Sequence, residues 1–305
     1  MEIVKVVIRQ VIIMYILIAT GYYAYKKKLI SDQGSKDLGK ILLNIAIPVV
    51  IISNFCVERT PEVVRDLLSS ALISLICMAI AIAVAVFIYH GRNRIDEFSA
   101  AFSNAGFIGI PLVQSTLGAG AVFYISIMIV LINLLQWTYG VFTITDDKKY
   151  INARMVTKNP IVIAVAIGVI VFALNIKLPP IVSSVFSIIS GINSPLAMMV
   201  SGVYLAQSDI LSMIRKKDVY LVSAVRLLLI PLVSILIMKV IPFGSLTLKL
   251  AILLAGAAPV GSNVAIFAAQ YGKDYKRGIE NVCISTLLCI ISLPLIVYVA
   301  NLILS

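Results

Sequence analysis

The chain has 305 residues, of which 61% are apolar and only 13% charged, and its mean hydropathy is +1.06. Soluble domains are about 45–50% apolar and about 25% charged, so the composition excludes a soluble enzyme, a disordered protein and a secreted disulfide scaffold. The net charge of +11 does not indicate nucleic-acid binding, because the basic residues form short clusters between apolar runs, as in the cytoplasmic loops of membrane proteins. The four cysteines lack metal-site spacing and are interpreted as core residues.

Ten apolar runs follow one another along the chain, each near the length that crosses a bilayer as a helix. They are too long for barrel strands and do not alternate, so helices are the structure that satisfies the backbone in lipid. The first run has no cleavage site after it and is interpreted as a retained helix. The predicted helices cover about 4–25, 38–56, 67–89, 98–117, 121–144, 160–175, 181–206, 219–240, 247–271 and 278–304.

The two halves of the chain repeat faintly. Pro48 and Pro195 lie 147 residues apart in helices 2 and 7, and Pro111 and Pro259 lie 148 apart in helices 4 and 9. Two sets of five helices must be inserted in opposite directions, which predicts a 5+5 inverted repeat. The fold class is therefore an all-α membrane protein of ten transmembrane helices. Residues 1–144 form the first repeat, 145–159 a cytoplasmic linker and 160–305 the second repeat.

The distribution of lysine and arginine predicts the orientation. If both termini lie outside, the inside loops carry 17 basic residues, from the cluster Lys26–Lys28 to Arg277, and the outside segments carry seven. Cytoplasmic loops are enriched in Lys and Arg. We therefore expect a multi-pass protein of the cell membrane with both termini outside.

Helices 4 and 9 each contain an interruption made of glycine, proline and asparagine. Helix 4 has Asn104 and Pro111, with Gln114 following, and helix 9 has Pro259, Ser262 and Asn263. Proline frees a backbone carbonyl four residues earlier, glycine lets the backbone unwind, and asparagine offers both donors and an acceptor. Interruptions at matching positions of inverted halves indicate the substrate site of a transporter, where half-helix N-termini favour an anion. A mere kink is the competing interpretation.

These stretches, 104–113 in helix 4, 194–196 with Gly202 in helix 7 and 257–263 in helix 9, resemble the auxin efflux carrier family, which includes plant PIN carriers and bacterial carboxylate permeases. Helix 2, from Asn44 to Pro48, also matches. The resemblance implies a fold like those of the bile-acid symporters and sodium–proton antiporters. It implies a scaffold domain of helices 1, 2, 6 and 7, a transport domain of helices 3–5 and 8–10, and elevator-type movement with substrate where broken helices 4 and 9 cross. The long cytoplasmic loop of the large plant carriers is absent.

Four further polar residues are candidates for the pathway. Arg226 in helix 8 could clamp a substrate carboxylate, or extend to the surface or pair with an acid. Glu280, near the start of helix 10, could relay protons or only favour the helix N-terminus. Asn44 and Asn193 could face the substrate from the scaffold helices.

The leading hypothesis is a secondary transporter of small organic anions, such as a dicarboxylate or an auxin-like acid. No nucleotide-binding loop occurs. An intramembrane enzyme is disfavoured because the sole histidine, His90, lies at a helix end and the aspartates lie in loops or at helix ends. A channel or a membrane receptor for a small organic acid is the alternative. No metal or cofactor is expected. We expect that transport does not require sodium, because the breaks contain no carboxylate. A homodimer through the scaffold domain is considered.

Overall fold

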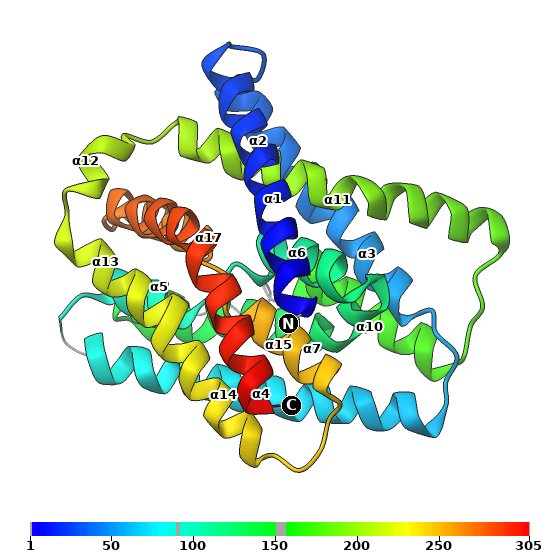
Figure 1. The fold of residues 1–305 in the computed structure, drawn as a ribbon. Helices are drawn as coiled ribbons and strands as arrows, with labels where there is room; N and C mark the ends of the chain where they lie inside the picture. The colour runs from blue at the N-terminus through cyan, green and yellow to red at the C-terminus, as the bar shows by residue number, and fades with distance from the viewer. Residues whose placement is uncertain (1, 90–91, 151–156, 305) are drawn as a thin grey trace.

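The computed structural model describes residues 2–89, 92–150 and 157–304, and the ribbon in Figure 1 follows them from blue to red. His90 and residues 151–156 of the predicted linker lie outside the described residues. The described part of the first half is a series of helices and short turns. These are α1 (Glu2–Lys26), α2 (Asp32–Ile41), η1 (Leu42–Ala46), α3 (Ile47–Phe55), α4 (Pro61–Tyr89), α5 (Arg94–Ala101), η2 (Ala105–Gly109), α6 (Ile110–Leu117), η3 (Ala119–Ala121), α7 (Val122–Leu135), η4 (Gln136–Gly140), α8 (Val141–Thr145) and η5 (Lys148–Tyr150).

The second half has the same character and ends in the longest helix. Its elements are α10 (Pro160–Ala173), α11 (Pro180–Ala206), α12 (Ile210–Ile214), α13 (Lys217–Ala224), η6 (Val225–Leu229), α14 (Ile230–Val240), α15 (Leu246–Gly256), α16 (Asn263–Gln270) and α17 (Tyr275–Leu304).

Within the described residues, seven helical stretches are long and apolar enough to cross a membrane, and three apolar helices of 10–17 residues are shorter. Two of the short ones, 105–117 and 246–256, are halves of the interrupted helices predicted at 98–117 and 247–271. The third, α10, has 14 residues, about 21 Å at 1.5 Å per residue. The protein is thus an all-helical, multi-pass membrane protein.

Three prolines are each preceded by a widened turn. The π-helical turns η1, η2 and η6 end directly before an Ile-Pro pair, and the isoleucine N–H bonds to the carbonyl five residues earlier. A proline ring clashes with the carbonyl four residues before it, and the wider turn relieves this while the helix continues. Pro48, Pro111 and Pro231 therefore mark bulges within helices, so Pro111 does not lie in the interruption of helix 4.

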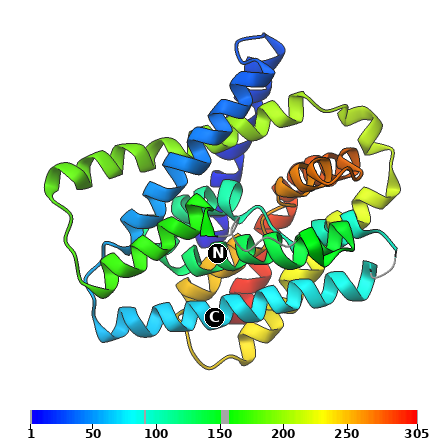
Figure 2. The same ribbon diagram turned by 180° about the vertical axis from the view of Figure 1, so that it is seen from behind.

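The helices predicted as scaffold pack closely at two glycines. α1 crosses α11 in close contact, and α3 runs along α10, as Figures 1 and 2 show. A Cβ on Gly21 would collide with the backbone of Met199, and one on Gly202 with the backbone of Ile18. Small residues let membrane helices pack backbone against backbone, so these two glycines fix the α1–α11 contact.

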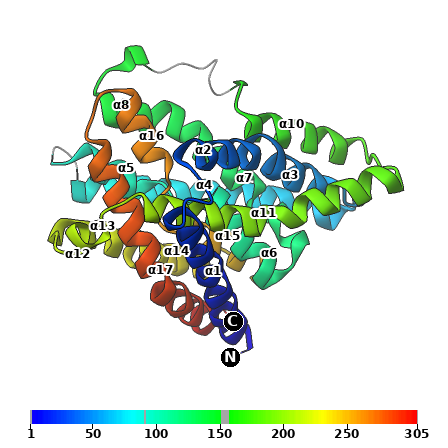
Figure 3. The same cartoon turned by 90° about the horizontal axis from the view of Figure 1, so that it is seen from above.

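Connections gather at opposite ends of the helix bundle. The connection after α3 meets the one after α10, because the Arg59 amide donates to Asn175 Oδ1 (3.2 Å). At the far end, Gln207 at the end of α11 donates to Asp32 Oδ1 at the start of α2 (3.1 Å). The two chain termini lie near each other at one edge of the molecule, as Figure 3 shows.

Candidate functional site

The two helix interruptions meet and bond to each other. The first break, residues 102–104, separates α5 from η2, and the second, residues 257–262, separates α15 from α16. Ser103 and Val260 form an antiparallel bridge. On one side of it the Asn104 amide donates to the Pro259 carbonyl (2.7 Å), and on the other the Gly261 amide donates to the Phe102 carbonyl (3.0 Å). The backbone groups released by unwinding therefore satisfy one another, as they must in an apolar interior.

The starts of both second half-helices line one small cavity. Asn104 comes from the first break and Ser262 from the second, and the opposite wall comes from α11 and α17. We name this space the break cavity; its lining residues are Asn104, Phe107, Ser201, Tyr204, Leu205, Ser262, Val282, Cys283 and Thr286.

A larger cavity of about 310 Å³ adjoins the break cavity, since the two share Tyr204, Ser262, Val282 and Cys283. We name it the vestibule. Its walls are mostly apolar, and Lys36 and Gln207 lie on its lining. Lys36 is exposed and makes no ion pair within the described part of the chain. The two spaces together lead from the paired breaks toward the end of the bundle where α2 begins.

Asn104 caps the half-helix that follows it. Its Oδ1 accepts from the Phe107 amide (3.3 Å), and its backbone carbonyl accepts from Ile108 and Gly109 (3.0 Å each). The side chain is 8% exposed and lines the break cavity. The cap uses the acceptor of the side-chain amide, and the Nδ2 donor makes no hydrogen bond to another described residue. That donor is free for a ligand in the cavity.

Asn263 has a different environment. Its Nδ2 donates to Gln136 Oε1 (2.7 Å) in η4, and Gln136 is itself 2% exposed. Asn263 is not part of the lining of the break cavity or of the vestibule, whereas its neighbour Ser262 lines both. No side-chain cap covers the start of α16. The structure thus brings Asn104 and Ser262 together and directs Asn263 toward a neighbouring helix.

Arg226 lies on the other side of the crossing, where both first half-helices end. Its Nη1 donates to the carbonyls of Ala100 (3.0 Å) and Ala101 (3.1 Å), and its Nη2 donates to the Gly256 carbonyl. The side chain is 2% exposed. It neither extends to the surface nor pairs with a carboxylate within the described chain, and it lines neither the break cavity nor the vestibule.

Glu280 lies in an ionic cluster away from the breaks. It is 7% exposed and accepts from Lys216 Nζ (2.5 Å), with Arg277 Nη1 3.9 Å away. Arg277 in turn forms a two-pronged ion pair with Asp96 of α5 (2.8 and 2.9 Å), and Asn281 donates to the same carboxylate (2.8 Å).

Sequence reasoning missed Asp96, Arg277 and Asn281, which tie α5 to α17. Asp96 is only 4% exposed. It sits in the first turn of a helix capped by Asn93, where an acid is common without any other role. Only its burial reveals the network.

The other predicted residues lie apart from the break cavity. Asn44 is exposed and donates to the Lys40 carbonyl (2.8 Å). Asn193 is fully buried in α11, and both polar atoms of its side chain lack a partner in the described structure, as does Gln114 Oε1 in α6. Pro111 is buried at the second position of α6. Among the described residues, no three His, Cys, Asp or Glu side chains are grouped as a metal site requires.

Broken helices that meet inside an apolar bundle, with half-helix ends on a shared cavity, are the construction of secondary transporters. The membrane transport protein family model matches residues 6–158 and 153–297, and the chain belongs to this family, the auxin efflux carrier family. The uncharacterized transporter YfdV of Escherichia coli K12 is 20% identical over 310 residues, covering 94% of this chain and 96% of the relative. An uncharacterized transporter of Methanothermobacter thermautotrophicus is 25% identical over 299 residues, covering 93% and 95%.

Proposed function

We propose that this membrane transport protein is a secondary transporter of small organic anions, and that the break cavity holds the anionic group. The observation that carries the proposal is that two half-helix N-terminal ends, marked by Asn104 and Ser262, line the same space. Each helix N-terminus carries about half a positive charge and unpaired N–H groups. Two such ends, with the free Nδ2 donor of Asn104, suit a carboxylate.

The vestibule suits the rest of the substrate. Its volume of about 310 Å³ is within the usual range for small-molecule sites, about 300–1,000 Å³. The walls contributed by α16 and α17, such as Ala265, Ile266 and Ile279, are apolar, and Lys36 supplies a positive charge. A compact acid with an apolar body would bury that body here while its carboxylate reaches the break cavity.

The meeting of the two breaks supports the 5+5 inverted repeat of ten helices. Each half of the chain contributes one broken helix to the crossing, and the bridge pairs Ser103 of the first half with Val260 of the second. The Asn104 amide donates to the Pro259 carbonyl and the Gly261 amide to the Phe102 carbonyl, as in any antiparallel bridge. Interruptions that come from both halves and face each other are what an inverted repeat requires.

We propose an elevator mechanism, which the position of the cavities supports. Ser201, Tyr204 and Leu205 of α11 belong to the proposed scaffold domain, while Asn104 and Ser262 belong to the proposed transport domain. Movement of the transport domain along α11 would carry the half-helix ends, and an anion bound to them, to the other side. In this conformation the vestibule opens toward the start of α2, the side we propose to be cytoplasmic.

We also propose the cell membrane with both termini outside, on the distribution of basic residues. A C-terminal tag should be accessible to a membrane-impermeant reagent in intact cells. A tag that reacts only after permeabilisation would reverse the orientation.

A homodimer through the scaffold domain is proposed from its outer surface. Ile181, Val185, Ile188 and Ile192 form an exposed apolar stripe along α11, and Asn44 is an exposed amide between the exposed Ile41 and Ile45 of the neighbouring scaffold helix. An amide facing lipid is unfavourable, and a second copy would cover it. Mass measurement of the protein in nanodiscs tests the dimer, and a monomer would refute it.

A ligand-binding screen tests the anion site. The purified protein is heated with a panel of organic acids and, as controls, amines of similar size; a ligand that binds the folded state raises the apparent Tm. We expect carboxylates to stabilise it and amines not to. Ser201→Leu, which fills the break cavity, should abolish the shift, whereas Ser184→Leu on the exposed face of the same helix should keep it. Stabilisation by amines alone, or an unchanged shift in Ser201→Leu, would refute the site.

A further inference from the structure

Arg226 is the largest fully buried side chain among the described residues. It is the second residue of η6, the widened turn before Pro231. Its guanidinium donates three hydrogen bonds to carbonyls at the ends of two different half-helices. These are the carbonyls of Ala100, Ala101 and Gly256. One side chain therefore joins the C-terminal ends of α5 and α15.

These two ends need a positive charge. A helix C-terminus carries about half a negative charge and leaves its last carbonyls without an intrahelical partner. Two of them meet here in the apolar interior, where electrostatic interactions are stronger than in water. The guanidinium suits the position because it presents five donors in one plane and keeps its charge at all physiological pH values.

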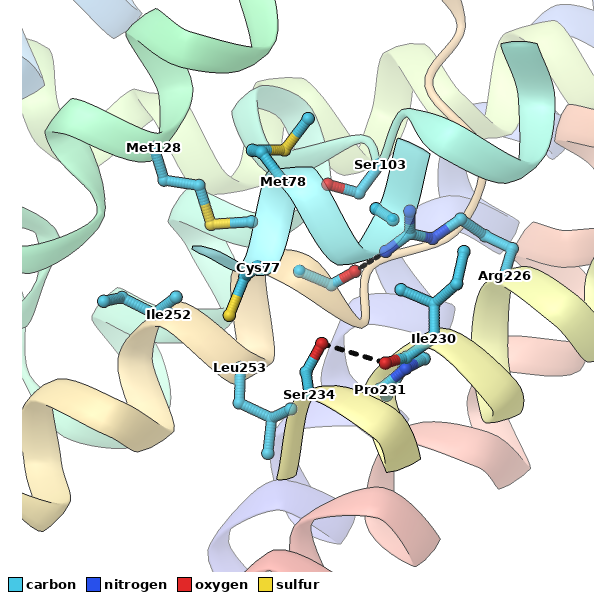
Figure 4. Close-up of a pocket in the computed structure, with 12 residues that line it drawn as sticks. Cys77, Met78, Ser103, Met128, Arg226, Ile230, Pro231, Ser234, Ile252 and Leu253 are labelled. Atoms are coloured by element: carbon cyan, nitrogen blue, oxygen red, sulfur yellow. Dashed lines mark hydrogen bonds between the residues drawn. The ribbon is translucent and has the colours of Figure 1, made fainter. Parts of the chain in front are cut away.

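Among the described residues, the lining of the neighbouring cavity offers no other charge to this group. The small cavity beside Arg226 is lined by neutral residues, among them Cys77, Ser103, Met128 and Ser234 (Figure 4). Its volume is about 10 Å³, room for about one water molecule. The Nε of Arg226 has no partner in the described structure, and a water in this cavity would satisfy it.

We propose that Arg226 is a built-in cation, which takes the place that a dissolved cation would otherwise occupy between the two half-helix C-termini. The crossing is then electrostatically complete on this side without a bound ion, and the N-terminal ends on the other side are left for the substrate. The proposal has a consequence for transport, which is that no cation need accompany the substrate. This consequence rests on the proposed function. The consequence for stability does not.

The stability test removes the cation and supplies it from solution. In Arg226→Ala, the three carbonyls lose their donor and a guanidinium-sized space opens. We expect a lower apparent Tm than in the wild type, and a rise of about 3 °C or more with millimolar methylguanidinium. Tetramethylammonium, a cation without N–H donors, should not restore it, and the wild type should respond to neither. Equal stability of Arg226→Ala and wild type, or equal rescue by both cations, would overturn the proposal.

Two further variants keep the test decisive if Arg226→Ala does not fold. Arg226→Lys retains a charge with donors, and Arg226→Met retains the approximate volume without a charge. We expect more folded Arg226→Lys than Arg226→Met, and a higher apparent Tm. If Met equals or exceeds Lys, the side chain acts by filling space and the built-in cation is refuted.

Transport supplies the independent test. Uptake by the wild type in proteoliposomes should have the same rate with sodium, potassium or choline as the external cation. A steep dependence on sodium would refute the absence of a coupled cation, even if the stability results hold. No saturable uptake under any cation would instead count against the proposed function.

Discussion

The two helix breaks share one hydrogen-bond pattern and yet are built differently. The first spans three residues and ends on Asn104, whose own side chain caps the next half-helix. The second spans six residues, contains Pro259, and leads into a half-helix without a side-chain cap. It is held from outside, because the Val260 amide donates to Ser285 Oγ (3.0 Å) and Asn263 donates to Gln136.

Similar residues in the two breaks therefore have different roles. Asn104 serves its own break and faces the break cavity, whereas Asn263 secures its break to another helix. One break is stabilised locally and the other by its neighbours. Substitutions in and around the two breaks should therefore differ in kind as well as in size.

Among substitutions in and around the breaks, the largest effects should come from bulk beside the second half-helices. A Cβ on Gly278 of α17 would lie 3.0 Å from Ala265 Cα and 3.1 Å from its N in α16, and one on Gly109 of η2 would lie 3.2 Å from Ala255 Cα in α15. We expect Gly278→Val to lower the free energy of unfolding by about 2–3 kcal/mol and Gly109→Val by about 1–2 kcal/mol.

Thermal unfolding of the purified variants measures both. Gly191→Val is the control, since a Cβ on Gly191 meets no other atom within 4 Å. If all three variants unfold at the same temperature, the close packing of the half-helices does not matter for stability.

Asn104 should have the next largest effect, and the effect should be on binding. Asn104→Ala removes both the cap and the free donor, so we expect at least about tenfold weaker substrate binding, about 1.4 kcal/mol, and about 1 kcal/mol lower stability. Asn104→Ser retains a cap, because serine is a good N-cap residue, but lacks the amide donor. It should regain most of the stability and stay weak in binding. Full recovery of affinity in Asn104→Ser would mean that Asn104 only braces the backbone.

Asn263 should show the opposite balance. Asn263→Ala leaves the buried Gln136 Oε1 without its donor, which costs about 1 kcal/mol of stability, and we expect at most about threefold weaker binding. A double-mutant cycle with Gln136→Ala should give a coupling energy of about 0.5 kcal/mol or more. Additive effects would show that the 2.7 Å contact contributes nothing, and a tenfold loss of affinity would place Asn263 in the site.

Pro111 should have the smallest effect. It lies in α6 behind the η2 turn and outside both breaks. We expect Pro111→Ala to change the free energy of unfolding by less than about 1 kcal/mol and to leave the substrate affinity unchanged. A strong loss of affinity would mean that the widened turn shapes the break cavity.

The membrane fold and the two interrupted helices could be predicted from the sequence, because apolar runs of bilayer length and paired Gly, Pro and Asn clusters are local signals. The contacts could not. The 148-residue offset predicts that Pro111 and Pro259 have matching roles, but Pro111 lies behind a helix bulge and Pro259 lies in a break. Packing between distant helices decides which end of a half-helix Arg226 faces. It also decides whether Asp96 is buried. A single sequence carries no signal for that packing.

Counterflow in proteoliposomes tests the central claim most directly, that an organic anion binds at the paired half-helix N-termini and is carried across. Vesicles are loaded with an unlabelled acid that stabilises the protein, and labelled acid is added outside. The wild type should accumulate label transiently above equilibrium, and the uptake should saturate. Asn104→Ala should need at least about ten times more external acid for half-maximal uptake. Flux that rises linearly without counterflow, as in a channel, or an unchanged half-maximal concentration in Asn104→Ala, would contradict the account.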